Sequence, residues 1–162
     1  MIKNVASLPL VPNVCDQMLR EVDQHLDHWS MAHVTMNPGD QSLLHKHNKT
    51  DEVYVITRGF GDLVVGNSVV AVRPGNVVRI DRGLPHKMIN RSLASLEHLV
   101  MAFPPFDPTD VHQLQEIEAS YRAGSLVEPG NVGDSIDGAR VVGYSFVDFD
   151  TSIAFGWTPH NP

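Results

Sequence analysis

Two histidines stand two residues apart, as His45 and His47, within a short segment that begins at Gly39. In an extended strand, side chains two residues apart point to the same face, so both imidazoles can bind one ion. Residues 48–51 include turn formers that can reverse the chain and bring Glu52 onto the same inner face. The sequence therefore predicts three ligands to one metal ion, two nitrogens and a carboxylate oxygen.

Another histidine, His86, follows the turn-forming residues 83–85 and precedes a segment predicted to be a strand. Because that turn can direct the imidazole towards the other three side chains, we expect His86 to complete the ligand set. A six-coordinate ion held by His45, His47, Glu52 and His86 keeps positions open for water or substrate. The expected site is thus a catalytic metal centre.

Three more side chains are candidates for catalysis. Tyr54 lies two residues after Glu52, so its phenol can act as an acid, a base or a hydrogen-bond donor to substrate at the metal. The alternative is a core tyrosine whose hydroxyl has a protein partner. His33 and His98 lie on strands predicted before and after the ligand segments, and each can either line the cavity or face outward. Glu97 alternates with His98, so at most one of this pair points inward.

The elements that must position these residues are short segments separated by Gly, Pro, Asn or Asp. Residues 14–26 fit either a helix or a short alternating strand, and we favour the strand. Further strands are predicted over 29–36, 52–57, 62–65, 69–72, 77–80, 87–90 and 96–103. Spacing of this kind predicts an all-β protein, an antiparallel sandwich or barrel.

The spacing of apolar residues changes after a proline-rich stretch that ends at Pro108. Asp107 or Thr109 can cap one short helix over about 109–122, which we expect to pack outside the barrel. The C-terminal part of the chain, 124–162, is predicted to be a loop over 124–139 followed by a late strand over 141–149.

The chain has 162 residues and keeps one composition throughout, so we expect a single domain over 1–162 with its core barrel at about 28–104. Lys and Arg number 12 against 19 Asp and Glu, a net charge of −7, and no basic stripe supports nucleic-acid binding. No apolar run is long enough to cross a bilayer, so we expect no membrane partner. The N-terminus lacks a secretory pattern and Cys15 is the single cysteine, which together predict a cytoplasmic protein.

The spacing of the predicted ligands resembles that of the cupin superfamily. The first cupin motif, which spans 39–59 here, is matched at every fixed position, by Gly39, His45, His47, Glu52 and Gly59. The second motif resembles residues 75–90, with Gly75, Gly83, His86 and Asn90 in place, although Asp81 stands where the family usually has proline. This departure changes a turn residue outside the ligand set, so we expect it to leave the metal centre intact.

The resemblance implies a jelly-roll β-barrel, frequent dimerisation, and a metal that is commonly iron, manganese, nickel, zinc or copper. We therefore expect a homodimer and one divalent metal ion per chain, Fe, Mn, Ni or Zn. The substrate is expected to be a small, largely apolar organic molecule, because few Arg or Lys are candidates for the cavity. Its apolar lining is expected from about half of a set of seven residues, Leu43, Val53, Val55, Ile56, Met88, Phe103 and Phe106.

Three functions are compatible with such a site. The favoured one is a dioxygenase-type oxidoreductase, similar to the cupin dioxygenases that use three histidines and one glutamate. The second is a metal-assisted isomerase, cyclase or lyase in which Tyr54 or a histidine moves a proton, similar to cupin polyketide cyclases or sulfoniopropionate lyases. The third is a cupin that binds a small molecule without catalysis.

Overall fold

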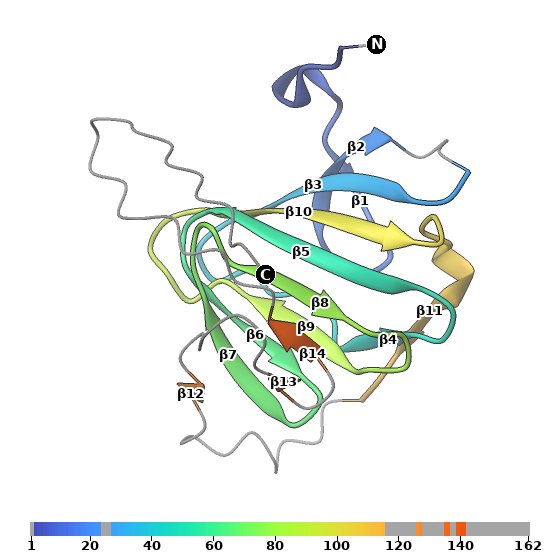
Figure 1. The fold of residues 1–162 in the computed structure, drawn as a ribbon. Coiled ribbons are helices and arrows are strands. Elements are labelled where there is room, and N and C mark those ends of the chain that lie inside the picture. The colour runs from blue at the N-terminus through green and yellow to red at the C-terminus, as the bar shows by residue number, and fades with distance from the viewer. Residues whose placement is uncertain (1, 24–26, 116–125, 128–134, 137–138, 142–162) are drawn as a thin grey trace, which may run out of the picture.

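Two β-sheets face each other in the computed structural model, which describes residues 2–23, 27–115, 126–127, 135–136 and 139–141 (Figure 1). The eight-stranded sheet has the order β1-β2-β3-β10-β5-β8-β14-β13. These strands are β1 (Val11–Pro12), β2 (Met18–Asp23), β3 (Ser30–Met36), β10 (Leu96–Phe103), β5 (Asp51–Arg58), β8 (Val77–Ile80), β14 (Ala139–Val141) and β13 (Ser135–Ile136).

The six-stranded sheet has the order β11-β4-β9-β6-β7-β12. Its strands are β11 (Val111–Gln113), β4 (His45–His47), β9 (His86–Ile89), β6 (Gly61–Val65), β7 (Ser68–Val72) and β12 (Leu126–Val127). All pairings are antiparallel except that of β12 with β7. The only helical segments among the described residues are two 3-10 turns, η1 (Val5–Ser7) and η2 (Pro108–Asp110).

The space between the sheets is filled at one end and hollow at the other. Strand β5 shows this change along its length, because Ile56 lies in the apolar core, Tyr54 belongs to the core and also lines a cavity, and Glu52 lines the cavity. The core cluster joins side chains of both sheets, including Ile56, Leu63, Val72, Ile80, Met88 and Leu96. Burial of this apolar surface stabilises the sandwich and fixes the strands that carry the site.

The alternation of buried and exposed side chains follows from the two-sided environment of each strand. On β3 the buried residues are Ser30, Ala32, Val34 and Met36, and the intervening residues face away from the cavity. Gly59 ends β5 with φ +76°, and a Cβ atom there would lie 2.3 Å from the carbonyl oxygen of Ser95. Only glycine fits this turn.

The predicted strands are confirmed, including the preference for a strand over a helix within 14–26, where β2 lies. The helix predicted over 109–122 is wrong for the part that the structure describes. Asp107 accepts a hydrogen bond from Thr109 N, as a cap would, but the 3-10 turn η2 leads directly into β11, which pairs with β4. Residues 116–122 lie outside the described residues.

The C-terminal predictions can be compared only in part. The described pieces of the predicted loop 124–139 include β12 and β13, so short strand pairings replace an irregular loop there. Val141 ends β14, and residues 142–149 of the predicted late strand lie outside the described residues. Within the described ranges, no helix has the length and apolar character needed to span a bilayer.

Candidate metal centre

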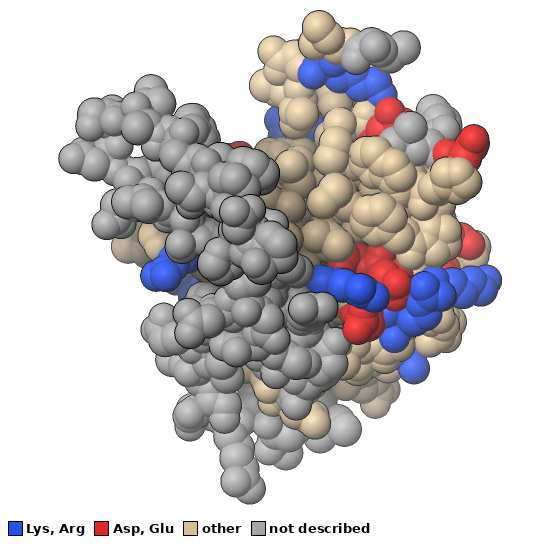
Figure 2. Space-filling view, in the orientation of Figure 1, with Lys and Arg blue, Asp and Glu red and all other residues tan. Residues whose placement is uncertain are grey.

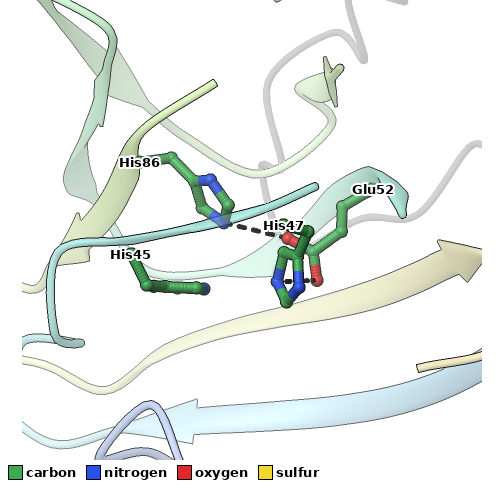
Figure 3. A group of neighbouring side chains, drawn as sticks. All are labelled: His45, His47, Glu52 and His86. Carbon is green, nitrogen blue, oxygen red and sulfur yellow. Dashed lines mark ion pairs between the residues drawn. The ribbon is translucent and has the colours of Figure 1, made fainter. Parts of the chain in front are cut away.

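The four predicted metal ligands come together between the two sheets (Figure 3). His45 and His47 lie on β4 and His86 opens β9, and these strands pair at the positions of His45 and His86. Glu52 faces them from β5, in the other sheet. One ligand atom from each side chain lies within 4.8 Å of the others, and all four residues are only 1–4% exposed. Ligand bonds of about 2.0–2.2 Å to a single ion require a cluster of roughly this size.

Backbone hydrogen bonds fix how two of the imidazoles are protonated. The Nδ1 atom of His45 lies 2.8 Å from the carbonyl oxygen of Leu43, and Nδ1 of His86 lies 3.0 Å from that of Leu84. A carbonyl oxygen can only accept, so Nδ1 carries the proton in each neutral ring, and Nε2 is then the nitrogen with a free lone pair. The two Nε2 atoms are therefore available as ligands.

The contacts of Glu52 call for a positive charge, which a metal ion or a proton on His86 can supply. Its Oε2 atom lies 2.9 Å from Nε2 of His86, and its Oε1 atom lies 3.6 Å from Nε2 of His47 (Figure 3). Two lone pairs at 2.9 Å repel each other unless a positive charge lies between them. Neither ring nitrogen of His47 has a hydrogen-bond partner within the described part of the chain, although the residue is buried. These unsatisfied groups fit a divalent metal ion.

The electrostatics of the cluster keep its ligands ready to bind a cation. Burial, together with the neighbouring His86, lowers the pKa of His45 to about 4. Burial also lowers the pKa of His47, against the opposing attraction of Glu52. Burial alone would raise the pKa of Glu52, but the hydrogen bond and charge of His86 and the charges of His47 and His45 lower it to about 2. At neutral pH the carboxylate of Glu52 is charged and the imidazoles of His45 and His47 are neutral, as metal binding requires.

A turn over residues 81–84 connects the ligand segments. Gly83 N donates to the carbonyl oxygen of His47 at 2.5 Å. The Arg82 guanidinium donates twice to Asp51 at 3.0 Å, and the hydrogen bonds and charge of this arginine lower the pKa of Asp51. Asp81 instead pairs with Arg79 at 2.7 Å, so the residue that departs from the cupin pattern lies outside the ligand cluster. On the face shown in Figure 2, acidic and basic side chains of the described residues lie side by side.

Asp110 also supports the site, and no sequence pattern marked it as a site residue. This carboxylate is 2% exposed and accepts hydrogen bonds from Lys49 N at 2.9 Å and Asn48 N at 3.2 Å. Burial would raise its pKa, but these backbone donors and the nearby His47 lower it. Asp110 therefore holds the turn between the histidine pair and the glutamate in place.

A cavity of about 570 Å³ opens beside the ligands and is lined by both His45 and Glu52. Its apolar lining comes mainly from β2, β3 and β10 and the segment after β10, through Leu19, Ala32, Val100, Ala102 and Phe106. Of the seven apolar residues predicted to line it, only Phe106 does so. Ile56 and Met88 lie in the core, and the other four do not line the cavity.

Two of the three predicted catalytic residues line this cavity. The hydroxyl of Tyr54 donates to Oε2 of Glu52 at 3.3 Å, and its ring lies 4.9 Å from that of His98. His98 is fully buried and points inward, so Glu97 points outward, as their alternation predicted. His33 lies on the opposite face of the sheet, 3.3 Å from Glu97, so the structure does not bring it to the site.

The cavity wall also includes Cys15, a residue that no sequence pattern marked. It is buried next to β2, and burial together with the charge of Glu52 raises the pKa of its thiol to about 12. The thiol is therefore protonated at neutral pH and contributes a small, uncharged surface to the cavity.

Comparison with known proteins agrees with this description. The family model of the cupin domain matches residues 32–102. An uncharacterized protein of Methanocaldococcus jannaschii is 31% identical over 86 residues, which cover 53% of this chain and 69% of that protein.

Solved structures share the fold at lower identity. A predicted oxalate decarboxylase of Thermotoga maritima is 22% identical with a TM-score of 0.58, over 64% of this chain and 99% of that one. The polyketide cyclase RemF of Streptomyces resistomycificus is 20% identical with a TM-score of 0.59, over 75% and 91%. The fold, the two motifs and the archaeal relative lead to one conclusion: this chain belongs to the cupin domain family.

Proposed function

We propose that this protein is a metal-dependent enzyme that moves a proton on a small, uncharged, largely apolar organic substrate, in an isomerisation, cyclisation or elimination. The observation that supports this proposal best is the buried hydroxyl of Tyr54, which lies beside the ligand Glu52 in the cavity wall. Related folds include both a cyclase and a predicted decarboxylase, so the fold alone does not choose between reactions.

The substrate class follows from the cavity wall. No Arg or Lys is among the described residues that line the cavity, and Glu21 and Glu52 contribute carboxylates to it. An anionic substrate would have no cationic side chain to bind there, whereas an uncharged molecule can bury its surface against apolar residues.

The chemistry combines a Lewis acid with a proton donor. A divalent cation held by the four ligands would polarise a carbonyl or enolate oxygen and would offset the charge of Glu52. Burial and the Glu52 carboxylate raise the pKa of Tyr54 well above its usual value, so its hydroxyl keeps the proton at neutral pH. Tyr54 gives this proton to a carbon or leaving oxygen of the substrate and recovers one from an acidified C–H bond, so the phenol ends each cycle protonated.

Proton exchange tests the proposal without knowledge of the natural substrate. Protein loaded with Zn²⁺, a redox-inert ion, is incubated under argon in D₂O with neutral cyclic enones and aryl ketones, and deuterium at carbon is followed by NMR. Wild-type protein is expected to catalyse exchange. Tyr54→Phe, which removes a single oxygen atom, is expected to lower the rate about 10²- to 10⁴-fold with unchanged zinc content.

The control is His33→Phe, because His33 lies on the opposite face of the same sheet and its loss is expected to leave exchange unchanged. Equal exchange rates in Tyr54→Phe and wild type would refute the role of the phenol. A loss of zinc from Tyr54→Phe would show instead that the hydroxyl positions Glu52 and does not transfer a proton.

A dioxygenase-type oxidoreductase is the second candidate, and the ligand set favours it. Three imidazoles and one carboxylate leave positions for an organic oxygen and dioxygen on one ion, and the adjoining cavity holds about 570 Å³. Oxygen-electrode measurements with Fe²⁺, Mn²⁺ or Ni²⁺ separate the two candidates. Oxygen uptake equal to substrate loss, with no proton exchange under argon, would show a dioxygenase in place of the enzyme proposed first. The absence of both oxygen uptake and proton exchange would leave a binding function.

A further inference from the structure

His98 is a buried polar residue whose ring nitrogens make no hydrogen bond to any described residue. Its side chain is 0% exposed, and neither ring nitrogen has a hydrogen-bond partner among the described residues. Burial of unpartnered polar atoms is costly, and buried polar groups in proteins almost always have a partner. His98 lines the cavity, so a molecule in the cavity can supply that partner.

The register of the strands places His98 further along the cavity wall than the ligand Glu52. Along the inner face of β10, Ala102 lies opposite Glu52, Val100 opposite Tyr54, and His98 opposite Ile56. The four residue steps from Ala102 to His98 span about 13 Å at the usual rise of a strand. The imidazole is held next to the Tyr54 ring, at a centroid distance of 4.9 Å.

Small side chains leave an elongated space along this part of the wall. On β3, Ser30 lies opposite Ala102 and Ala32 lies opposite Val100, and all four line the cavity. The next pair is His98 with Val34, which is buried but does not line the cavity. The cavity is thus elongated along β3 and β10, with Glu52 and the His98 imidazole at different levels of its wall.

The side chain of His98 brings no positive charge to the cavity. Burial lowers the pKa of His98 to about 4, against the opposing attraction of Glu52, so the ring is neutral at neutral pH. A neutral imidazole offers one N–H donor and one acceptor nitrogen. These groups match a hydroxyl or carbonyl, and they do not balance the charge of a carboxylate.

We infer that His98 determines substrate specificity by hydrogen bonding a hydroxyl or carbonyl at the end of the substrate remote from the metal ligands. The substrate class is therefore an elongated, uncharged molecule that carries an oxygen at each end and an apolar middle. This inference rests on the proposed function, because it takes the ligand cluster as the site where the other oxygen binds.

A matched pair of metal-binding probes tests the inference. Co²⁺-loaded protein is titrated with 4-hydroxycinnamohydroxamic acid and 4-methylcinnamohydroxamic acid, and the visible absorption of cobalt reports binding of the hydroxamate. The probes differ only in a hydroxyl against a methyl group of similar size, at the end remote from the metal-binding group. Wild-type protein is expected to bind the hydroxyl compound about 10- to 100-fold more tightly.

The variants His98→Leu and His98→Phe are both expected to reduce this preference to within about threefold, and either one suffices if the other does not fold. Circular dichroism and cobalt content establish folding and loading. His33→Leu, on the opposite face of the sheet, is the control and is expected to keep the wild-type preference. No preference in wild type, or a preserved preference in a folded His98 variant, would overturn the inference.

Acetohydroxamic acid, which is too short to reach His98, separates failure of this inference from failure of the site. If it binds and neither cinnamohydroxamic acid does, the cavity does not accept elongated molecules and the inference fails alone. If it does not perturb the cobalt spectrum either, the metal centre itself is refuted. Proton exchange by Tyr54 is measured independently of both results.

Discussion

At the scale of the residue, His45 and His86 each make one hydrogen bond to the backbone, and this bond decides which ring nitrogen faces the ligand cluster. In both cases Nδ1 donates to the carbonyl oxygen two residues earlier, that of Leu43 or Leu84. This repeated local contact fixes the ring orientation before an ion binds. His47 has no such contact within the described residues, so its ring is the least constrained of the three.

His47→Ala is expected to lower metal affinity by more than about 100-fold. The loss of a residue that only hydrogen-bonds to a ligand already costs about 10- to 100-fold, and this substitution removes a ligand itself. The barrel is expected to remain folded, since the rest of β4 keeps its pairing with β11 and β9. Metal content after dialysis and far-UV circular dichroism check both statements. His33→Ala is the control histidine, and full metal occupancy in His47→Ala would contradict the ligand assignment.

The candidate ligand cluster was predictable from sequence because the constraints on its residues are local. The spacing of His45 and His47 meets the two-residue period of a strand, and Tyr54 follows Glu52 by the same period. The directions of His33 and His98 were not predictable, since each strand has two faces. The pairing of His33 with Leu99 and of Val34 with His98 decides which histidine points inward, and such a register is a long-range property.

At the scale of the element, β11 and Asp110 show how tertiary pairing overrides a local helical pattern. Residues 110–122 have apolar side chains at helical spacing, but the backbone groups of Val111–Gln113 pair with the free edge of β4. This pairing brings Asp110 under the turn at Asn48 and Lys49. A single sequence does not show which edge of a sheet needs a partner, so neither the strand nor the role of Asp110 could be predicted.

Asp110→Ala is expected to destabilise the protein by roughly 2–4 kcal/mol, because two backbone N–H groups lose a charged acceptor. It is also expected to lower metal affinity about 10- to 100-fold through the displaced turn. Urea unfolding and competition with a chelating dye measure the two effects. Asp107→Ala, which removes the half-buried cap of η2, is expected to have a smaller effect on both.

The pH dependence of this contribution has a definite sign. The folded state lowers the pKa of Asp110, so its stabilising effect is fully present above the unfolded pKa of about 4 and is lost as pH falls through the lower folded pKa. The stability difference between wild type and Asp110→Asn, measured in EDTA, should therefore shrink below pH 4. A difference that grows on acidification would contradict the assignment.

At the scale of the whole molecule, the apolar core and the cavity lie next to each other between the sheets and share Leu19, Ala32 and Tyr54. The core around Ile56, Leu63 and Met88 fills one end, and the cavity with its buried polar groups occupies the other. The two-sheet architecture was predictable from the short, regularly spaced strands. The shape of the cavity was not, because it depends on segments far apart in sequence, such as Cys15 and Phe106.

Metal removal is expected to destabilise the whole molecule. An ion present at 100 times its dissociation constant stabilises the folded state by about 2.7 kcal/mol, which for a chain of this size corresponds to about 5–10 °C in Tm. Calorimetry with Zn²⁺ or Mn²⁺ and then with excess EDTA measures the shift. His47→Ala should show no shift, and an equal Tm for wild type with and without metal would contradict a structural contribution of the site.

Glu52 belongs to one sheet and the three histidines belong to the other. The distances between donor atoms therefore depend on the width of the gap between the layers, which the core residues at the filled end help to set. A larger or smaller side chain at Leu63 or Ile56 can thus change the fit of an ion without touching it. The bulk of a few apolar side chains would thus set the spacing of the four candidate ligands.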